Sequence, residues 1–194
     1  MAWFDSPEYE ADDIIGTLAT FMRGEGLRCT LVSRDKDLAQ LVGPGDVYWD
    51  YTGQNRYHHG EIEHRFGVAP ERYADYLALT GDAVDNIPGV PGVGPKTAAA
   101  LMKNYRSLDD LYERLDTVRD LPLRGAAKLV GRLAMHRDAA FLARALTRIC
   151  CDMPLPVTRE GLRRRGPDLA GLDQFCDAQG FGSLLRRQAG RLAL

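Results

Sequence analysis

The chain lacks the long apolar segments that a membrane protein requires. No stretch of its 194 residues approaches about 18 uninterrupted apolar side chains. The first residues, Met1-Ala-Trp-Phe-Asp5, also lack the basic and apolar regions of a signal peptide. We therefore expect a cytoplasmic protein that does not associate with membranes.

Cysteine motifs are absent as well. The four cysteines show neither CxxC spacing nor a histidine partner, so a zinc site or a redox motif has little support. The length and the 45% apolar content suit one globular domain whose core needs no disulfide. We expect reduced, mostly packed thiols at Cys29, Cys150, Cys151 and Cys176.

The net charge of −2 is small, but acids and bases are segregated along the chain. Residues 1–97 hold 16 acidic and 8 basic groups, a net charge of −8, whereas residues 98–194 hold 11 acidic and 17 basic groups, a net charge of +6. This asymmetry suits a metal-binding half joined to a half that holds nucleic acid. Solvated surface faces would give a similar imbalance, so charge alone leaves both interpretations open.

The first 51 residues follow an α/β pattern. Ser6-Pro7-Glu8 has the features of a helix start, and apolar spacing carries that helix to about Arg23. Strands are expected at Leu27–Val32 and Val47–Tyr51, with a short helix over Leu38–Val42 between them. Because a helix intervenes, the two strands should be parallel.

Beyond Tyr51 the pattern predicts a polar loop through Gly60 and then mainly helices. The expected helices cover Glu61–Phe66, Pro70–Leu79, Lys96–Tyr105, Leu108–Leu115, Gly125–Ile149 with a break near His136, and Leu172–Gln179. A small α/β part should therefore be followed by a helical part.

The segment Asp85-Asn-Ile-Pro-Gly-Val-Pro-Gly-Val-Gly-Pro-Lys-Thr-Ala98 is the most distinctive feature of the chain. Its glycines leave backbone N–H groups unobstructed at a helix start, a geometry that binds anions. Lys96 adds a positive charge and Thr97 a hydroxyl group, which suits a DNA backbone phosphate and conveys no base information. We expect sequence-independent, salt-sensitive DNA binding.

Two alternatives compete with this interpretation. Gly89 and Gly94 have the spacing of a nucleotide-binding GxxxxGK[ST] loop, but Pro95 intrudes before Lys96 and removes one N–H donor. We therefore expect no nucleotide cofactor. A purely structural turn between two helices remains the other alternative.

Seven acids occur in three short groups. They are Glu10, Asp12 and Asp13 at a helix start, Asp35 and Asp37 after a strand, and Asp82 and Asp85 before the glycine-rich segment. Each group alone could serve a helix dipole, a turn or a cap. If the end of the strand faces the same crevice as the helix start, the acids converge and need cations such as Mg²⁺ or Mn²⁺ to offset their repulsion.

The order of these motifs resembles the 5′ nuclease superfamily. That group includes flap endonucleases, stand-alone bacterial 5′–3′ exonucleases and the 5′–3′ exonuclease domain of bacterial DNA polymerase I. The likeness rests on PGVPGVGPKTA, which resembles a helix-hairpin-helix (helix–three-turn–helix) element, and on the motifs around Tyr9–Asp13, Ser33–Leu38 and Gly81–Pro88. It covers about residues 8–150. The implied fold is a PIN-like α/β nuclease core with a partial parallel sheet, followed by a mainly helical region.

The resemblance also implies ligands. A tighter metal site is implied at Glu10, Asp12, Asp13, Asp35 and Asp37, and a second at Asp82 and Asp85. Asp12, Asp13, Asp35 and Asp37 are the implied catalytic acids. A potassium ion is implied at the main-chain carbonyls of Leu79, Thr80, Pro88, Val90 and Val93, and DNA contacts at Gly92, Val93, Gly94, Pro95, Lys96 and Thr97.

The implied activity is two-metal hydrolysis of DNA phosphodiester bonds in flap, nicked or 5′-ended duplex during replication and repair. The resemblance further implies a monomer that acts alongside a DNA polymerase and a ligase. Residues 1–80 would form the C-terminal part of the metal-binding α/β core. Residues 81–150 would form the helix-hairpin-helix DNA-binding region, and residues 151–194 a basic C-terminal tail.

One departure from the family pattern bears on the expected activity. Members begin with a strand bearing a metal-binding aspartate and then carry a basic helical arch, whereas residues 1–7 already look like the strand before the first helix. About a third of the usual domain is therefore expected to be missing upstream. A catalytically impaired, structure-selective DNA-binding module is the alternative function.

Overall fold

The computed structural model describes residues 2–192. Contacts divide the chain into two compact units, Asp5–Leu155 and the described part of residues 1–4 with 156–194. Within residues 2–192, no helix is both long enough and apolar enough to cross a bilayer. The cytoplasmic location stays a prediction, as does the division of the first 150 residues at residue 80.

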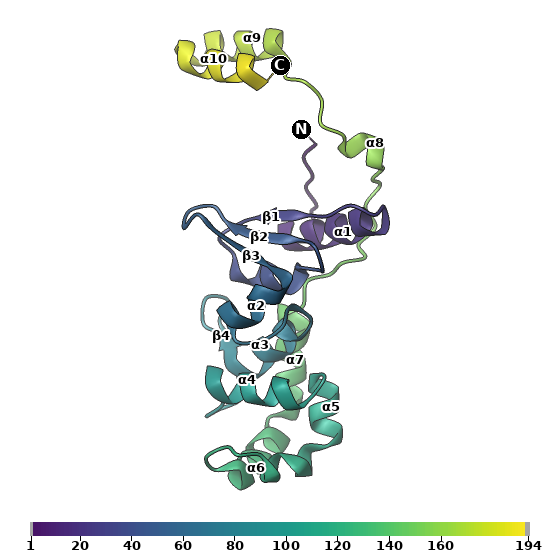
Figure 1. The fold of residues 1–194 in the computed structure, drawn as a ribbon, viewed down its shortest axis with the longest axis vertical. Coiled ribbons are helices and arrows are strands. Elements are labelled where there is room, and N and C mark those ends of the chain that lie inside the picture. The colour runs from purple at the N-terminus through teal and green to yellow at the C-terminus, as the bar shows by residue number, and fades with distance from the viewer. Residues whose placement is uncertain (1, 193–194) are drawn as a thin grey trace. The chain divides into compact units, whose positions relative to one another are not determined.

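The Asp5–Leu155 unit begins with a small sheet and its covering helices (Figure 1). Its first elements are α1 (Ala11–Gly24), β1 (Thr30–Val32), the 3₁₀ helix η1 (Lys36–Leu41), β2 (Val47–Asp50), β3 (Asn55–His58) and α2 (His59–Phe66). The sheet has the order β1-β2-β3. Thr30 pairs with Val47 in a parallel ladder, which confirms the parallel arrangement predicted for the first two strands.

A buried carboxylate aligns the two parallel strands. Asp46 is fully buried, and its Oδ1 accepts the Cys29 N–H at 2.7 Å just before β1. Its Oδ2 accepts the Gly43 N–H at 3.0 Å and Arg23 Nε at 2.7 Å. Since buried carboxylates are stable only when paired and hydrogen-bonded, this arrangement ties α1, the turn and both strands together.

The prediction of a polar loop from Tyr51 to Gly60 is wrong in part. Asn55–His58 forms β3, antiparallel to β2. Packing supplies the reason, because Tyr57 of β3 stacks near Tyr48 of β2, with ring centroids 6.2 Å apart, and both rings contact Phe66 of α2. Cross-strand aromatic pairing of this kind stabilises a strand whose sequence is otherwise polar.

Two expectations near the N-terminus are also corrected. The first helix begins at Ala11 rather than near Ser6, because Ser6 Oγ accepts the Glu8 and Tyr9 N–H groups and forms a separate turn. The strand expected over residues 1–7 is absent from the described residues 2–7, which make no ladder hydrogen bonds, and Met1 lies outside the described part.

The helical part of the same unit follows. Its elements are η2 (Pro70–Arg72), α3 (Tyr73–Thr80), β4 (Gly81–Asp82), β5 (Ile87–Pro88), α4 (Pro95–Asn104), α5 (Leu108–Glu113), η3 (Leu115–Asp120), α6 (Ala126–Met135) and α7 (Arg137–Thr147). The break predicted near His136 is confirmed, since that residue separates α6 from α7. The mixed α/β fold with a helical second part is therefore confirmed.

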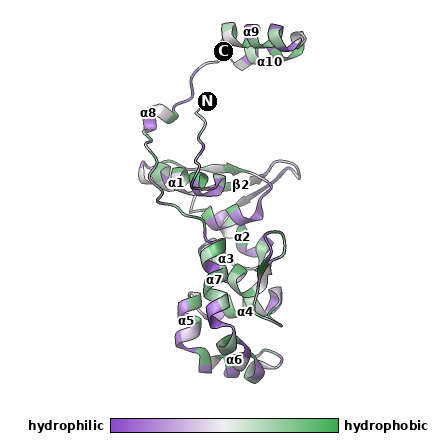
Figure 2. Ribbon diagram, turned by 180° about the vertical axis from the view of Figure 1, so that it is seen from behind, coloured by the Kyte–Doolittle hydropathy of each residue, from purple (hydrophilic) through white to green (hydrophobic). Residues whose placement is uncertain are grey.

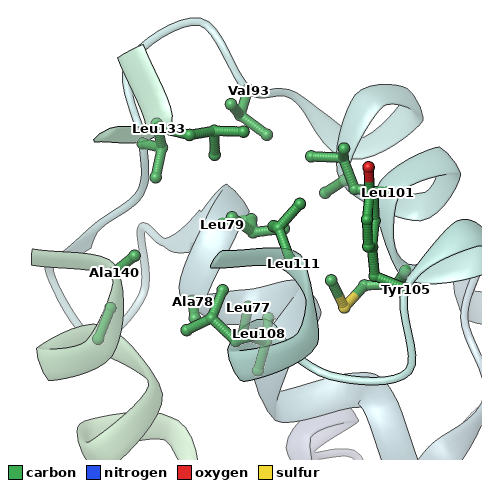
Figure 3. Packing of buried hydrophobic residues seen from close by; sticks show 14 of the residues in the cluster. Leu77, Ala78, Leu79, Val93, Leu101, Tyr105, Leu108, Leu111, Leu133 and Ala140 are labelled. Atoms are coloured by element: carbon green, nitrogen blue, oxygen red, sulfur yellow. The ribbon is translucent and has the colours of Figure 1, made fainter. Parts of the chain in front are cut away.

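A single buried cluster organises these helices around α3. Helix α3 is coloured mainly as hydrophobic in Figure 2, and its residues Leu77, Ala78 and Leu79 are buried. They pack with Leu101 of α4 and Leu133 of α6 in the cluster drawn in Figure 3. At roughly 25 cal/mol per Å² of apolar area removed from water, such a cluster is the main stabilising term of this part.

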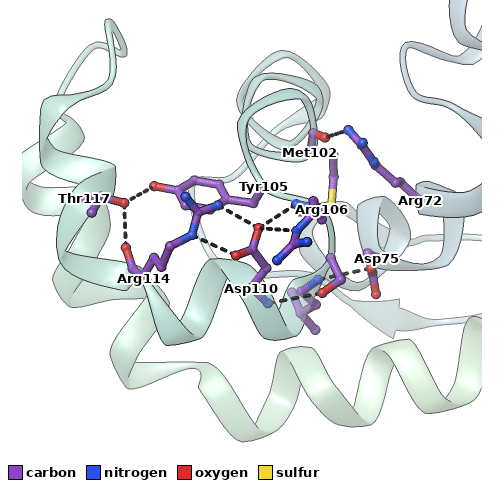
Figure 4. Close-up of polar contacts among 10 residues, drawn as sticks. Arg72, Asp75, Met102, Tyr105, Arg106, Asp110, Arg114 and Thr117 are labelled. Carbon is purple, nitrogen blue, oxygen red and sulfur yellow. Dashed lines mark hydrogen bonds and ion pairs between the residues drawn. The ribbon is translucent and has the colours of Figure 1, made fainter.

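A polar network closes the turn between α4 and α5 (Figure 4). Asp110 accepts the Arg106 N–H at 2.7 Å, and its two oxygens bind Nε and Nη2 of Arg114 at 2.7 and 2.6 Å. Tyr105 Oη lies 2.8 Å from Thr117 Oγ1, with the Arg114 guanidinium over the Tyr105 ring. The network fixes the C-terminal end of α4.

The other unit contains α8 (Arg159–Leu162), α9 (Leu169–Gln179) and α10 (Ser183–Leu192). Of these, the sequence predicted α9 alone. Arg186 of α10 pairs with Asp173 and Asp177 of α9 at 2.8 and 2.6 Å. The rings of Phe175 and Phe181 lie 5.8 Å apart, so α9 and α10 form a small hairpin of their own.

Candidate metal centre and nucleic-acid interface

The first group of acids lies at the start of α1. Glu10 is the N-cap residue, and its N–H donates to Asp13 Oδ2 at 3.1 Å. The other Asp13 oxygen, Oδ1, accepts the Cys150 N–H at 2.7 Å. The two main-chain donors fix the Asp13 carboxylate and leave one lone pair on each oxygen for a further ligand.

The second group follows β1, as the sequence predicted. Asp35 caps η1 by accepting the Asp37 N–H at 3.0 Å. Asp37 is half-buried, and its Oδ1 is buried without a hydrogen-bond partner among the described residues. A buried carboxylate oxygen without a donor costs on the order of 1–3 kcal/mol or more unless a cation or a proton compensates it.

The third group flanks the β4–β5 turn. Asp82 is buried, its Oδ1 accepts the Val84 N–H at 2.8 Å, and its Oδ2 lies 2.6 Å from Lys36 Nζ. Although burial alone would raise the pKa of Asp82, the Lys36 ammonium group beside it lowers that pKa below the ordinary value. Asp85 is exposed at the edge of the same group.

The three groups converge in the structure. A cleft of about 600 Å³ is lined by six of the seven acids, Glu10, Asp12, Asp13, Asp35, Asp37 and Asp85. Asp82 joins an adjoining cleft of about 430 Å³ together with Asp35, Asp37 and Asp85. One carboxylate oxygen from each of Asp37, Asp82 and Asp85 lies within 4.8 Å of the other two.

The electrostatics of the cleft follow from this convergence. Burial, followed by the negative charge of Asp35, raises the pKa of Asp37 to about 6. Burial also raises the pKa of Asp12, and Asp35, Glu10, Asp13 and Asp85 add to the increase. Carboxylates that repel one another in this way gain stability when a divalent cation shares their charge.

The donor set fits a hard divalent cation. All of the clustered side-chain ligands are carboxylate oxygens, the type that Mg²⁺ and Mn²⁺ prefer. The partnerless Asp37 Oδ1 is the observation in this chain that calls for a positive ligand. Asp37 belongs by geometry with Asp82 and Asp85, although the resemblance assigned it to the other ion.

The predicted DNA-binding segment forms the turn between β5 and α4. A Cβ atom on Gly89 would lie 2.3 Å from the Thr80 carbonyl carbon, so this close approach of two backbones requires glycine. Helix α4 begins after Gly94, with Pro95 at its first position and no side-chain cap. The N–H groups of Lys96 and Thr97 in its first turn are therefore free of intrahelical partners and available to an anion.

The implied potassium ligands come from two segments that lie together. Pairing of Gly81 with Pro88 brings Leu79 and Thr80 beside the stretch from Pro88 to Val93. The Leu79 carbonyl accepts the Val90 N–H and the Val90 carbonyl accepts the Val93 N–H, both at 2.9 Å, and each oxygen keeps a second lone pair.

The sequence did not single out two basic residues of the acidic clefts. Lys36 contacts Asp82, and its position between Asp35 and Asp37 is the signal that could have identified it. Arg148, the C-cap residue of α7, lines the 600 Å³ cleft together with the acids. No local pattern identifies Arg148, because α7 joins the cleft only through tertiary packing.

Comparisons with known proteins agree with these features. Residues 1–67 match the family described as "5′-3′ exonuclease, N-terminal resolvase-like domain". Residues 68–170 match "5′-3′ exonuclease, C-terminal SAM fold". A thermostable DNA polymerase I from Thermus filiformis is 39% identical over 181 residues, covering 93% of this chain and 21% of the relative.

A 5′-3′ exonuclease from Buchnera aphidicola (Schizaphis graminum) is 36% identical over 151 residues, covering 78% of this chain. The chain spans about a fifth of the polymerase relative and 53% of this exonuclease.

Solved structures share the fold. A T5 5′-exonuclease mutant superposes with a TM-score of 0.64 at 24% identity, covering 74% of this chain and 57% of the other. A phage T5 flap endonuclease, described as a pseudo-enzyme–product complex with DNA and metal ions, superposes with a TM-score of 0.63 at 23% identity, covering 74% of this chain and 51% of the other. The fold, the order of the motifs and both family matches lead to one conclusion: the chain belongs to the 5′–3′ exonuclease family.

Proposed function

We propose that this chain forms the metal-binding and DNA-holding part of a structure-selective 5′–3′ exonuclease or flap endonuclease that hydrolyses DNA phosphodiester bonds. The observation that carries the proposal is the convergence of acids from α1, from the end of β1 and from the β4–β5 turn on one cleft. The resemblance had already implied this grouping, and the geometry now supports it.

The acids have distinct proposed roles. Glu10, Asp12, Asp13 and Asp35 hold one divalent ion, and Asp82 and Asp85 hold a second, with Asp37 facing the second pair. Mg²⁺ or Mn²⁺ bound there would lower the pKa of a water nucleophile and neutralise charge on the phosphate. The protein itself supplies orientation, because hydrogen bonds from main-chain donors fix the carboxylates of Asp13 and Asp35.

DNA binding is proposed at Gly92–Thr97. The free N–H groups at the start of α4 and the positive charge of Lys96 suit a backbone phosphate of flap, nicked or 5′-ended duplex. The Leu79, Thr80, Pro88, Val90 and Val93 carbonyls are the proposed potassium ligands beside it. A monomeric protein working alongside a DNA polymerase and a ligase in replication and repair is the corresponding biological proposal.

One observation favours the alternative of a DNA-binding module that does not cut. The Lys36 ammonium group already neutralises Asp82, one of the carboxylates proposed for the second ion. If that ion pair persists when metal is present, the second site would not fill.

The purified chain should be tested on a labelled 5′-flap duplex with Mg²⁺, Mn²⁺ or EDTA. We expect metal-dependent cleavage that Asp12→Asn abolishes and that Asp116→Asn, a change at an exposed carboxylate on η3, leaves unchanged. Binding without cleavage by the unaltered chain would support the alternative. Absence of both binding and cleavage would refute the proposed function.

A further inference from the structure

Two segments of the helical part contain no acidic residue. No aspartate or glutamate occurs between Asp85 and Asp109, or between Asp120 and Asp138. The first segment contains α4 and the second contains α6. In a chain whose acids slightly outnumber its bases, two such stretches form a local excess of positive charge.

The fold brings these two segments into contact. Gly92, in the turn before α4, has φ +76°, and a Cβ atom built on it would lie 2.0 Å from Nη1 of Arg132 on α6. Val93 and Leu133, which follow Gly92 and Arg132 in the sequence, belong to the same buried cluster (Figure 3). The Arg132 guanidinium therefore packs directly against the turn that is proposed to hold a phosphate.

Arg132 differs in its partners from the arginines of α5 and α7 that bind nearby acids. Its Nε is buried without a hydrogen-bond partner, and the Arg132 side chain has no ion pair among residues 2–192. By contrast, Arg114 binds Asp110, and Arg144 contacts both Asp75 and Asp109. No acceptor among the described residues engages this guanidinium, and its Nη groups are not buried, so they are available to an acceptor from outside the chain.

The acceptor must be anionic. The positive end of α4, the Lys96 ammonium group and Arg132 gather at one turn, and neither basic side chain has an ion pair within the described residues. An arginine fork matches the oxygens of a phosphate, and it can bind two of them at once.

Resting on the proposed function, we infer that Arg132 binds a DNA backbone phosphate next to the one held at the start of α4. The phosphate contact extends the DNA-binding surface from the hairpin onto α6. This contact touches no base, so it raises the affinity for DNA and fixes the position of the protein along the backbone without adding a sequence preference.

The Arg132→Gln variant tests this inference. Its affinity for a labelled 5′-flap duplex is measured by fluorescence anisotropy, with EDTA present so that no strand is cut. We expect the dissociation constant to rise about tenfold at moderate salt. The slope of log K against log salt concentration should fall in magnitude by about one, because one fewer counterion is released.

Arg119→Gln is the matched control, since it makes the same charge change at an exposed residue paired with Asp116 on η3. We expect its affinity and salt slope to equal those of the unaltered chain. If Arg132→Gln also behaves like the unaltered chain while Lys96→Ala loses affinity, the inference is overturned. If neither Arg132→Gln nor Lys96→Ala weakens binding, the proposed function of the hairpin itself fails.

A structural role for Arg132 makes different predictions. Because Nε has no hydrogen-bond partner in the free protein, we expect Arg132→Gln to leave the urea midpoint unchanged. If Arg132 instead stabilised the fold, the same substitution would lower that midpoint. Arg132→Lys keeps the positive charge and loses the fork, so it should retain the salt slope while losing part of the affinity. A normal affinity for Arg132→Lys combined with a lower urea midpoint for Arg132→Gln would contradict the phosphate contact.

Discussion

The amide of Cys150 donates a 2.7 Å hydrogen bond to Oδ1 of Asp13, a residue 137 positions earlier in the chain. This bond joins the segment after α7 to the start of α1. It lies at the edge of the acidic cleft, which both residues line. The same carboxylate therefore helps to hold two parts of the unit together and presents charge to the proposed metal site.

Asp13→Ala should destabilise the fold as well as the metal site. The change leaves the N–H groups of Cys150 and Glu10 without acceptors, and we expect a loss of about 1–3 kcal/mol in the free energy of unfolding. Urea denaturation in EDTA measures this loss without any contribution from metal. An unchanged urea midpoint would show that water replaces the carboxylate at no cost.

Lys36→Met should make the stability of the protein depend on divalent metal. Asp82 is buried and Lys36 is its charged partner, so the variant should lose about 1–3 kcal/mol in EDTA. Added Mg²⁺ should then raise the melting temperature of the variant more than that of the unaltered chain, because metal no longer competes with the ammonium group. Equal metal-induced shifts would argue against such competition.

Gly89→Ala should disrupt the hairpin turn. The new Cβ atom would lie 2.3 Å from the Thr80 carbonyl carbon and 2.5 Å from the Gly81 nitrogen, so the backbone must shift. We expect a loss of about 1–3 kcal/mol in stability together with weaker DNA binding. Gly131→Ala on α6 is the control, because its Cβ would meet nothing within 4 Å and should stabilise that helix by about 0.5–1 kcal/mol.

Asp75→Asn should stabilise the fold at neutral pH. Burial raises the pKa of Asp75 above 3.8 despite the Leu108 N–H and the nearby Arg144, so the folded state favours the protonated acid. The wild-type carboxylate therefore destabilises the fold above that raised pKa, and this penalty disappears as the pH falls through it towards 3.8. Asparagine removes the charge, and Arg144 keeps its contact with Asp109.

Urea denaturation at several pH values between 7.5 and 4 tests the Asp75 prediction. The stability advantage of Asp75→Asn should be largest at pH 7.5 and should shrink as the solution becomes more acidic. A variant less stable than wild type at every pH would show instead that the ion pair between Arg144 and Asp75 outweighs the cost of burial.

Local signals predicted much of the architecture. The parallel pairing of β1 with β2 and a helix from about Lys96 follow from spacing, proline and glycine, which act within a few residues. The break near His136 was also predicted. The pattern failed at β3, whose polar sequence becomes a strand because Tyr57 packs on Tyr48 and Phe66. A contact between separate elements outweighed local preference there.

The candidate site divides in the same way. The sequence by itself determined the three acidic groups and the glycine-rich turn, because helix starts, strand ends and close backbone approaches are encoded by neighbouring residues. Only the tertiary structure decided that Asp37 faces Asp82 and Asp85, that Cys150 binds Asp13 and that Arg132 reaches Gly92. Those contacts join residues about 40 to 137 positions apart, and packing of whole elements sets such distances.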